Sequence, residues 1–182
     1  MSKQLMIDTL KNNHTQKINF KYIGTVGVYR VVSGDFRTVA LNIEQGNISV
    51  QQGGAPAGKA RYSMRQDGAS AANTFYLGAN NAAPNVYNSL LVHESVHAAF
   101  DLKGIIMPWL DNEAIAYIAQ GFYILSAGED GGLAEQAFLG LEAAKSMQNG
   151  GGDSFWLDAL RASLLGDPLY KQYINGTFRG DG

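Results

Sequence analysis

Two histidines and a glutamate stand at a spacing that suits metal chemistry. His93 and His97 are four residues apart and Glu94 directly follows the first histidine, which gives the pattern His-Glu-x-x-His. On a helix, residues four apart lie on the same face, so both imidazoles can reach one metal ion. Glu94 is turned by about 100° from His93, so its carboxylate can reach a metal-bound water without binding the metal itself. The pattern therefore predicts two zinc ligands and a general base.

The residues around this pattern favour a metal site over a chance match. The flanks, Leu90–Val92 and Ala98–Phe100, are wholly apolar, which predicts a helix that is buried nearly all round. Two histidines and a glutamate inside such a helix cost free energy unless a partner compensates them. A bound metal ion would be that partner.

A catalytic zinc ion usually has three protein ligands and one open position, so the chain must supply a third ligand. Glu113 is the best candidate, because it opens a second apolar helix that a tight turn can lay across the first. Its alternative role is that of a routine acidic residue near a helix N-terminus. The third histidine, His14, lies in a polar turn and is expected to face solvent. Asp101 is about 12 Å along the helix from His93, too far for one ion, and is expected to accept a hydrogen bond from His97 or to be solvated.

The His-Glu-Ser-Val-His motif at 93–97, followed by Asn112-Glu113 on a second helix, resembles the zincin metallopeptidases whose third ligand is a glutamate, the gluzincins. The resemblance implies that the two histidines and Glu113 bind zinc and that Glu94 is the general base. It also implies that the strand Asn73–Leu77 is the sheet edge that pairs with the extended backbone of a substrate.

The chain departs from thermolysin-like gluzincins at two points. Those enzymes have an aspartate four residues after the ligand glutamate, where this chain has Tyr117, so the candidates to orient a histidine are Asp101 and Asp111. They also use a later histidine to stabilise the oxyanion, and no histidine follows the motif here. A tyrosine could donate this hydrogen bond instead, and we assign the role to Tyr117, with Tyr87 and Tyr123 as alternatives. Each of these tyrosines could also simply pack in the core.

Composition limits the classes of protein to which this chain can belong. Its 182 residues, 46% hydrophobic and 16% charged, are expected to form one globular domain over 1–182 with a sizeable core. The net charge of −2 argues against nucleic acid as a partner, and the lack of a long apolar stretch argues against a membrane. The absence of cysteine excludes disulfides, cysteine-bound zinc and thiol nucleophiles. No signal peptide is recognisable, so we expect a cytoplasmic location or export without one, and the oligomeric state stays open.

The elements that position this chemistry follow from periodicity and turn residues. We expect an α+β, zincin-like fold, with an N-terminal helix and a small antiparallel or mixed sheet over 1–84 and a mainly helical part over 85–182. The expected strands are one or two within Ile18–Val32, then Arg37–Ile43, Ile48–Gln52, Arg61–Arg65 and Asn73–Leu77. The expected helices are Ser2–Leu10, the metal-binding helix Asn85–Lys103, Asn112–Ser126 with Asp111 as its N-cap, Leu133–Met147, one capped by Asp153, and a short one over 167–174 before a frayed tail at 176–182.

Together these features predict zinc-dependent hydrolysis of peptide bonds, with a peptide or protein as substrate. In this hypothesis Zn²⁺ polarises a water molecule and the scissile carbonyl, and Glu94 transfers the proton of the water to the leaving amine. One alternative is a structural or interaction protein in which the fold holds a non-catalytic metal ion or none. A second alternative is a protease of the same chemistry that acts as a toxin or effector.

Overall fold

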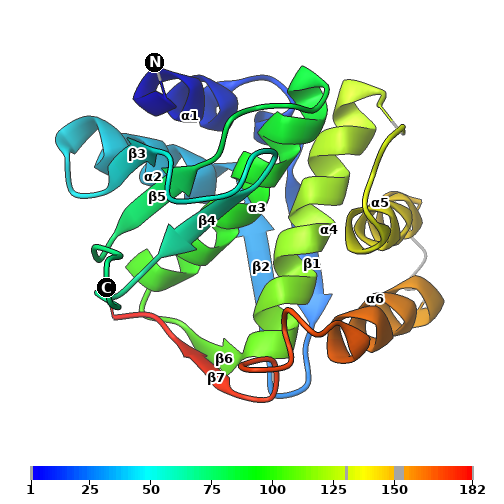
Figure 1. Cartoon of the computed structure of the whole chain (residues 1–182). Helices are drawn as coiled ribbons and strands as arrows, with labels where there is room; N and C mark the ends of the chain where they lie inside the picture. Colours follow the sequence, from blue (N-terminus) through cyan, green and yellow to red (C-terminus); the bar gives the residue numbers. More distant parts are fainter. Residues whose placement is uncertain (1, 130, 150–153, 182) are drawn as a thin grey trace.

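The computed structural model describes residues 2–129, 131–149 and 154–181, and over these ranges the chain has a mixed α+β fold. Two long helices, α3 (Pro84–Leu102) and α4 (Trp109–Ala127), run side by side through its middle (Figure 1). A three-stranded sheet packs against α3, whereas α5 (Glu135–Gln148) and α6 (Ser154–Gly166) pack against α4. The predicted α+β class is confirmed. No helix within the described ranges is long and apolar enough to cross a membrane.

A helix and a β-hairpin form the first part of the chain. α1 spans Ser2–Lys11, and the hairpin consists of β1 (Asn19–Ile23) and β2 (Val28–Val32), which pair antiparallel. Alternation along β1 buries Phe20 and Tyr22 and exposes the residues between them. The strands predicted within residues 18–32 are therefore the two arms of one hairpin.

The predicted strand Arg37–Ile43 is wrong, because these residues lie inside helix α2 (Ser33–Gln45). Val39 and Ile43 lie four apart on its buried face, whereas Leu41 between them is 49% exposed. The Asp35 carboxylate accepts a hydrogen bond of 3.1 Å from the backbone amide of Val32, the residue just before the helix. This contact favours a helix start at this position. The alternation of three apolar residues only imitates a strand.

The main sheet is mixed and has the strand order β3–β5–β4. Its strands are β3 (Ser49–Gln52), β4 (Ala60–Ser63) and β5 (Thr74–Leu77). β5 is parallel to β3 and antiparallel to β4, and all four of its residues are buried. The expectation that the strand at 73–77 is a sheet edge is wrong, since β5 is central. The free edge beside α3 is β4.

Both long helices end near their predicted limits, and α3 also begins near its predicted start, whereas α4 does not. It begins at Trp109, upstream of the predicted start, so Asp111 is not its N-cap. Asp111 is instead fully buried in the first turn, where it accepts hydrogen bonds of 2.7–2.9 Å from Tyr22 and Thr25. Arg161 of α6 pairs with the same carboxylate at 3.2 Å. Asp111 therefore joins the hairpin, α4 and α6.

The C-terminal segment returns to the middle of the molecule. The short helix predicted at 167–174 is wrong, because this stretch forms a series of turns. The tail predicted to fray instead forms β7 (Thr177–Arg179), which pairs antiparallel with β6 (Ile106–Pro108) in the connection between α3 and α4. The predicted cap Asp153 lies outside the described residues. The last segment thus comes to lie beside the start of α4 (Figure 1).

Candidate metal centre

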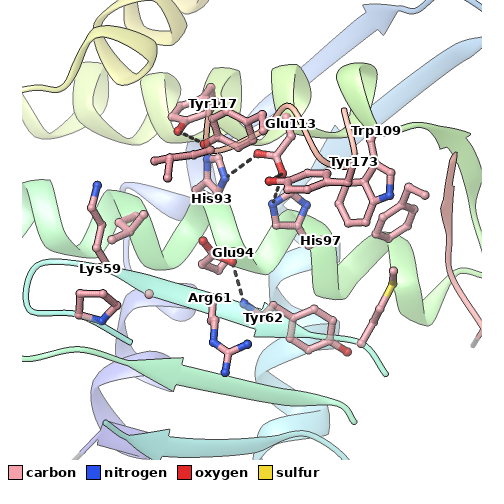
Figure 2. A pocket seen from close by; sticks show the side chains of 17 residues that line it. Lys59, Arg61, Tyr62, His93, Glu94, His97, Trp109, Glu113, Tyr117 and Tyr173 are labelled. Carbon is pink, nitrogen blue, oxygen red and sulfur yellow. Dashed lines mark hydrogen bonds and ion pairs between the residues drawn. The ribbon is translucent and has the colours of Figure 1, made fainter. Parts of the chain in front are cut away.

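The three predicted metal ligands lie together between α3 and α4. His93 and His97 occupy successive turns of α3 and face α4, and Glu113 projects toward them from the N-terminal part of α4 (Figure 2). The short connection through β6 turns the chain back, so that α4 packs along α3. Ligand atoms from the three side chains lie within 4.8 Å of one another, and all three residues are buried. This cluster could hold a metal ion.

The spacing inside the cluster fits a cation better than direct hydrogen bonds. Nε2 of His93 lies 3.4 Å from Oε2 of Glu113, and Nε2 of His97 lies 3.8 Å from Oε1. Hydrogen bonds from N–H to oxygen are about 2.7–3.2 Å long, whereas ligands in a tetrahedral zinc shell of about 2.0–2.1 Å are about 3.3 Å apart. Oε2 of Glu113 is buried and has no hydrogen-bond partner among the described residues. A bound cation would satisfy this atom.

Electrostatics favour the metal-binding forms of two of these side chains. Burial lowers the pKa of His97 to about 4, so its imidazole is neutral. Burial raises the pKa of Glu113, but the neighbouring His97 and His93 outweigh it and hold this pKa below its ordinary value. For His93, burial lowers the pKa, but the carboxylates of Glu113 and Glu94 outweigh burial and raise it. A metal ion that binds His93 would displace its proton.

Asn112 fixes the orientation of His97. Oδ1 of Asn112 lies 2.5 Å from Nδ1 of His97, and both side chains are buried. This contact leaves Nε2 of the imidazole for a metal. The predicted partners do not take this role, because Asp101 accepts a hydrogen bond of 2.8 Å from the Tyr62 hydroxyl, and Asp111 is held by the hairpin and α6.

Gln120 lies beside the other imidazole. Nδ1 of His93 and Oε1 of Gln120 are both buried and have no hydrogen-bond partner among the described residues. Gln120 also raises the pKa of His93, although its effect is smaller than those of burial and of the two carboxylates. A ring N–H and an amide oxygen are complementary, so Gln120 is placed to orient His93. Both histidines thus have a neutral amide as neighbour.

Glu94 lies between α3 and the edge strand β4. Its Oε2 accepts a hydrogen bond of 2.8 Å from the backbone amide of Tyr62 (Figure 2). Burial raises the pKa of Glu94 to about 7, against the opposing influences of His93 and the Tyr62 amide. A carboxyl group with such a pKa can accept and release a proton at neutral pH. Glu94 is not part of the three-ligand cluster.

A cleft of about 590 Å³ opens over the cluster and Glu94. One wall is formed by β4 and the loop before it, and the other by the start of α4 and the C-terminal segment (Figure 2). The aromatic side chains that line it are Tyr62, Trp109, Tyr117, Tyr170, Tyr173 and Phe178. The cleft is therefore wide enough for a chain segment and largely aromatic on the side of α4.

Two tyrosines stand close to the cluster. The ring of Tyr117 lies 4.4 Å from that of His93, but its hydroxyl is hydrogen-bonded to the Tyr170 hydroxyl at 2.5 Å. The Tyr173 hydroxyl donates a long hydrogen bond of 3.3 Å to Oε1 of Glu113. Tyr173 thus borders the cluster more directly than Tyr117 does.

The two alternative tyrosines lie elsewhere. The Tyr87 hydroxyl donates to the backbone carbonyl of Gly78, and the Tyr123 hydroxyl accepts from Asn12. His14 is half-buried rather than solvent-facing, and its Nδ1 lies 3.1 Å from the Ser126 hydroxyl. None of these residues lines the cleft.

The sequence did not predict the roles of four residues of the site, namely Gln120, Asn112, Tyr62 and Tyr173. Asn112 had a usable signal, since an amide directly before the candidate ligand Glu113 was visible in the sequence. Tyr62 binds Glu94 through its backbone, so its side-chain type carried no signal. Tyr173 lies in the stretch 167–174 that was predicted as a short helix, yet it is 36% exposed and lines the cleft.

Comparison with protein-family models, with curated proteins and with solved structures found no match to this chain. The geometry and chemistry of the cleft are therefore the basis for inferring a function.

Proposed function

We propose that this protein is a zinc-dependent peptidase of the zincin type. The observation that carries the proposal is the convergence of His93, His97 and Glu113, with Glu94 beside them and bonded to the free edge of a sheet. Two imidazoles and one carboxylate are a ligand set of catalytic zinc, which keeps an open position, whereas structural zinc has four protein ligands. Among the described residues the cluster contains no fourth His, Cys, Asp or Glu.

Residues of the chain itself would transfer the proton of the attacking water and hold the backbone of the substrate. The chemistry that zinc supplies when bound is Lewis acidity toward a water molecule and the scissile carbonyl. Glu94 accepts a proton from the attacking water and gives it to the nitrogen of the leaving amine. The water oxygen bonds to the carbonyl carbon and the C–N bond breaks, so the products are a carboxylic acid and an amine.

The edge strand β4 would hold an extended peptide beside Glu94. The Gly78 amide donates to the Lys59 carbonyl, and hydrogen-bonded pairs alternate along antiparallel strands, so Arg61 also faces β5 with its backbone. The backbone groups of Ala60 and Tyr62 point to the free edge instead. The Tyr62 amide is taken by Glu94, which leaves the Ala60 amide and both carbonyls for a peptide that adds to the sheet.

A tyrosine would stabilise the negative charge that develops on the carbonyl oxygen. Tyr173 is the better placed donor, since its hydroxyl borders Glu113, and Tyr117 is the second candidate on the same wall. Replacement of the donor tyrosine by phenylalanine should lower kcat by about 10²-fold. Comparison of Tyr173→Phe with Tyr117→Phe therefore shows which of the two tyrosines is the donor.

The test of this function is the Glu94→Gln variant, with Glu44→Gln on α2 as control. Purified proteins are loaded with zinc, and zinc content and hydrolysis of a mixture of unstructured peptides are measured. We expect Glu94→Gln to keep its zinc and to lose about 10²–10⁴-fold in turnover, because it cannot accept the proton. Loss of zinc in Glu94→Gln would show that Glu94 has another role. A wild-type protein that binds zinc and cleaves no peptide would favour the non-catalytic alternative.

A further inference from the structure

A second, smaller cavity opens beside the cleft. Its volume is about 180 Å³, and it shares Lys59, Leu90 and Tyr117 with the cleft, so the two adjoin at these residues. Apart from this rim it is lined by apolar groups, among them Val86 and Ala137, and by Tyr87 and Gln120. An apolar cavity of about 150 Å³ accommodates a benzene ring, so this space can take a large side chain.

Lys59 is a cation at the rim that the two cavities share. Its side chain is exposed and extends toward the end of the cleft nearer His93, whereas Trp109 lies at the end nearer His97 (Figure 2). No hydrogen bond or ion pair engages its ammonium group among the described residues. Arg61, the other cation of the cleft, is bonded to Ser70 and to the Gly54 carbonyl. Lys59 is therefore available to a ligand.

The position of Lys59 restricts the anion that it could meet. A carboxylate at the far end of a long side chain would reach the interior of the small cavity, where the described lining residues include no cation other than Lys59 at the rim. A carboxylate attached at or next to the peptide backbone would instead lie at the rim while an apolar side chain fills the cavity. The two carboxylates of the cleft, Glu94 and Glu113, lie at the metal centre, where a bound zinc ion would offset their negative charge.

The direction of β4 decides on which side of the scissile bond this anion lies. Lys59 directly precedes Ala60, the first residue of β4. A peptide that pairs antiparallel with β4, the slightly more stable arrangement, runs toward Lys59 as it passes the metal centre. The Lys59 end of the cleft therefore receives the residues that follow the scissile bond.

If the protein is the peptidase proposed above, we propose that Lys59 makes it selective for a carboxylate just after the scissile bond. The residue that follows this bond places an apolar side chain in the small cavity. The carboxylate on Lys59 is either the free C-terminus of that residue or the side chain of an acidic residue next to it. The first case makes the protein a carboxypeptidase.

The test uses four N-acetylated peptide libraries with a randomised N-terminal part and a common final Phe. Two end at Phe as the free acid or the amide, and two continue with Glu-amide or Gln-amide. Rates and cleavage positions are measured by mass spectrometry for the zinc-loaded wild type, Lys59→Met, Lys59→Arg and, as control, Lys21→Met on the outer face of β1. We expect the acid or the Glu library to be preferred by about tenfold in kcat/KM, as for one charge-assisted hydrogen bond.

The variants connect the preference to Lys59. Lys59→Met should abolish it, Lys59→Arg should keep it, and Lys21→Met should behave as the wild type. Preference for the acid over the amide identifies the C-terminal carboxylate, and preference for Glu over Gln identifies an acidic side chain. Cleavage without either preference, or with the same preference in Lys59→Met, overturns the role of Lys59 alone. No cleavage of any library overturns the peptidase function as well.

Discussion

The backbone amide of Tyr62 donates a hydrogen bond of 2.8 Å to Oε2 of Glu94. Strand β4 is a sheet edge, so this amide has no strand partner and Glu94 satisfies it. The bond links the edge that we propose to bind substrate to the residue that we propose as general base. In the proposed function, the same strand would set both the alignment of the substrate and the position of Glu94.

Removal of this amide should impair catalysis without loss of metal. Tyr62→Pro lacks the N–H group, and proline is tolerated on edge strands. Tyr62→Ala is the matched control, because it also loses the hydroxyl contact with Asp101 but keeps the amide. We expect kcat of Tyr62→Pro to be about tenfold below that of Tyr62→Ala, with equal zinc content. Equal kcat in the two variants would show that the bond does not position Glu94.

Gln120 should strengthen metal binding through His93. Gln120→Leu keeps the approximate volume of the side chain and removes the amide that raises the pKa of His93. Outer partners of metal-binding histidines are worth about 10–100-fold in affinity, so we expect a loss of at least about tenfold. The measurement is zinc affinity by competition with a chelator, with the exposed Gln4→Leu as control. Unchanged affinity in Gln120→Leu would refute the role of Gln120.

Close packing of α4 against α5 should depend on Gly121. A Cβ atom at this position would overlap the backbone carbonyl of Gly140 in α5. Gly121→Ala is therefore expected to lower the free energy of unfolding by about 2–3 kcal/mol in urea denaturation. Gly166→Ala is the control, since a Cβ at the end of α6 meets no atom within 4 Å. Equal stability of Gly121→Ala and the wild type would mean that the helices separate at little cost.

The Asp111 carboxylate should give the fold a specific dependence on pH. Burial raises its pKa, but hydrogen bonds from Thr25 and Tyr22 and the charge of Arg161 outweigh burial, so the pKa lies below its ordinary value of 3.8. A depressed folded-state pKa means that the ionised group stabilises the fold above pH 3.8, and that this stabilisation is lost as pH falls through the folded-state pKa.

The variant that checks this is Asp111→Asn, studied by urea denaturation between pH 3 and pH 7. We expect its free energy of unfolding to be about 2 kcal/mol or more below that of the wild type at pH 7. The difference should stay constant down to about pH 5 and shrink below about pH 4. A difference that is the same at every pH would exclude a contribution from the charge of Asp111.

The sequence predicted the parts of this site that depend on local spacing. The helix that carries His93 and His97, the helix that carries Glu113 and the place of Glu94 all follow from periodicity within one segment. Arg37–Ile43 was assigned wrongly because three alternating apolar residues fit a strand, whereas the burial of Val39 and Ile43 comes from the packing of α2 against α1 and α3.

Features that depend on distant segments were beyond local reasoning. The order β3–β5–β4 places β5 in the centre through pairing with strands on both sides of it, which no local pattern specifies. Tyr173 reaches Glu113 only because the C-terminal segment folds back beside α4, where β7 pairs with β6. The proposed oxyanion donor and the proposed substrate edge could therefore be identified only in three dimensions.

The central claim is that His93, His97 and Glu113 together bind one zinc ion, and zinc content tests it most directly. Wild-type protein, His93→Ala, Glu113→Ala and the control His14→Ala are loaded with zinc, freed of excess metal and analysed for zinc per chain, with folding checked by circular dichroism. We predict about one zinc ion per chain in the wild type and in His14→Ala, and only a small fraction in folded His93→Ala and Glu113→Ala. A wild-type protein without stoichiometric zinc, or variants that keep it in full, would contradict the account.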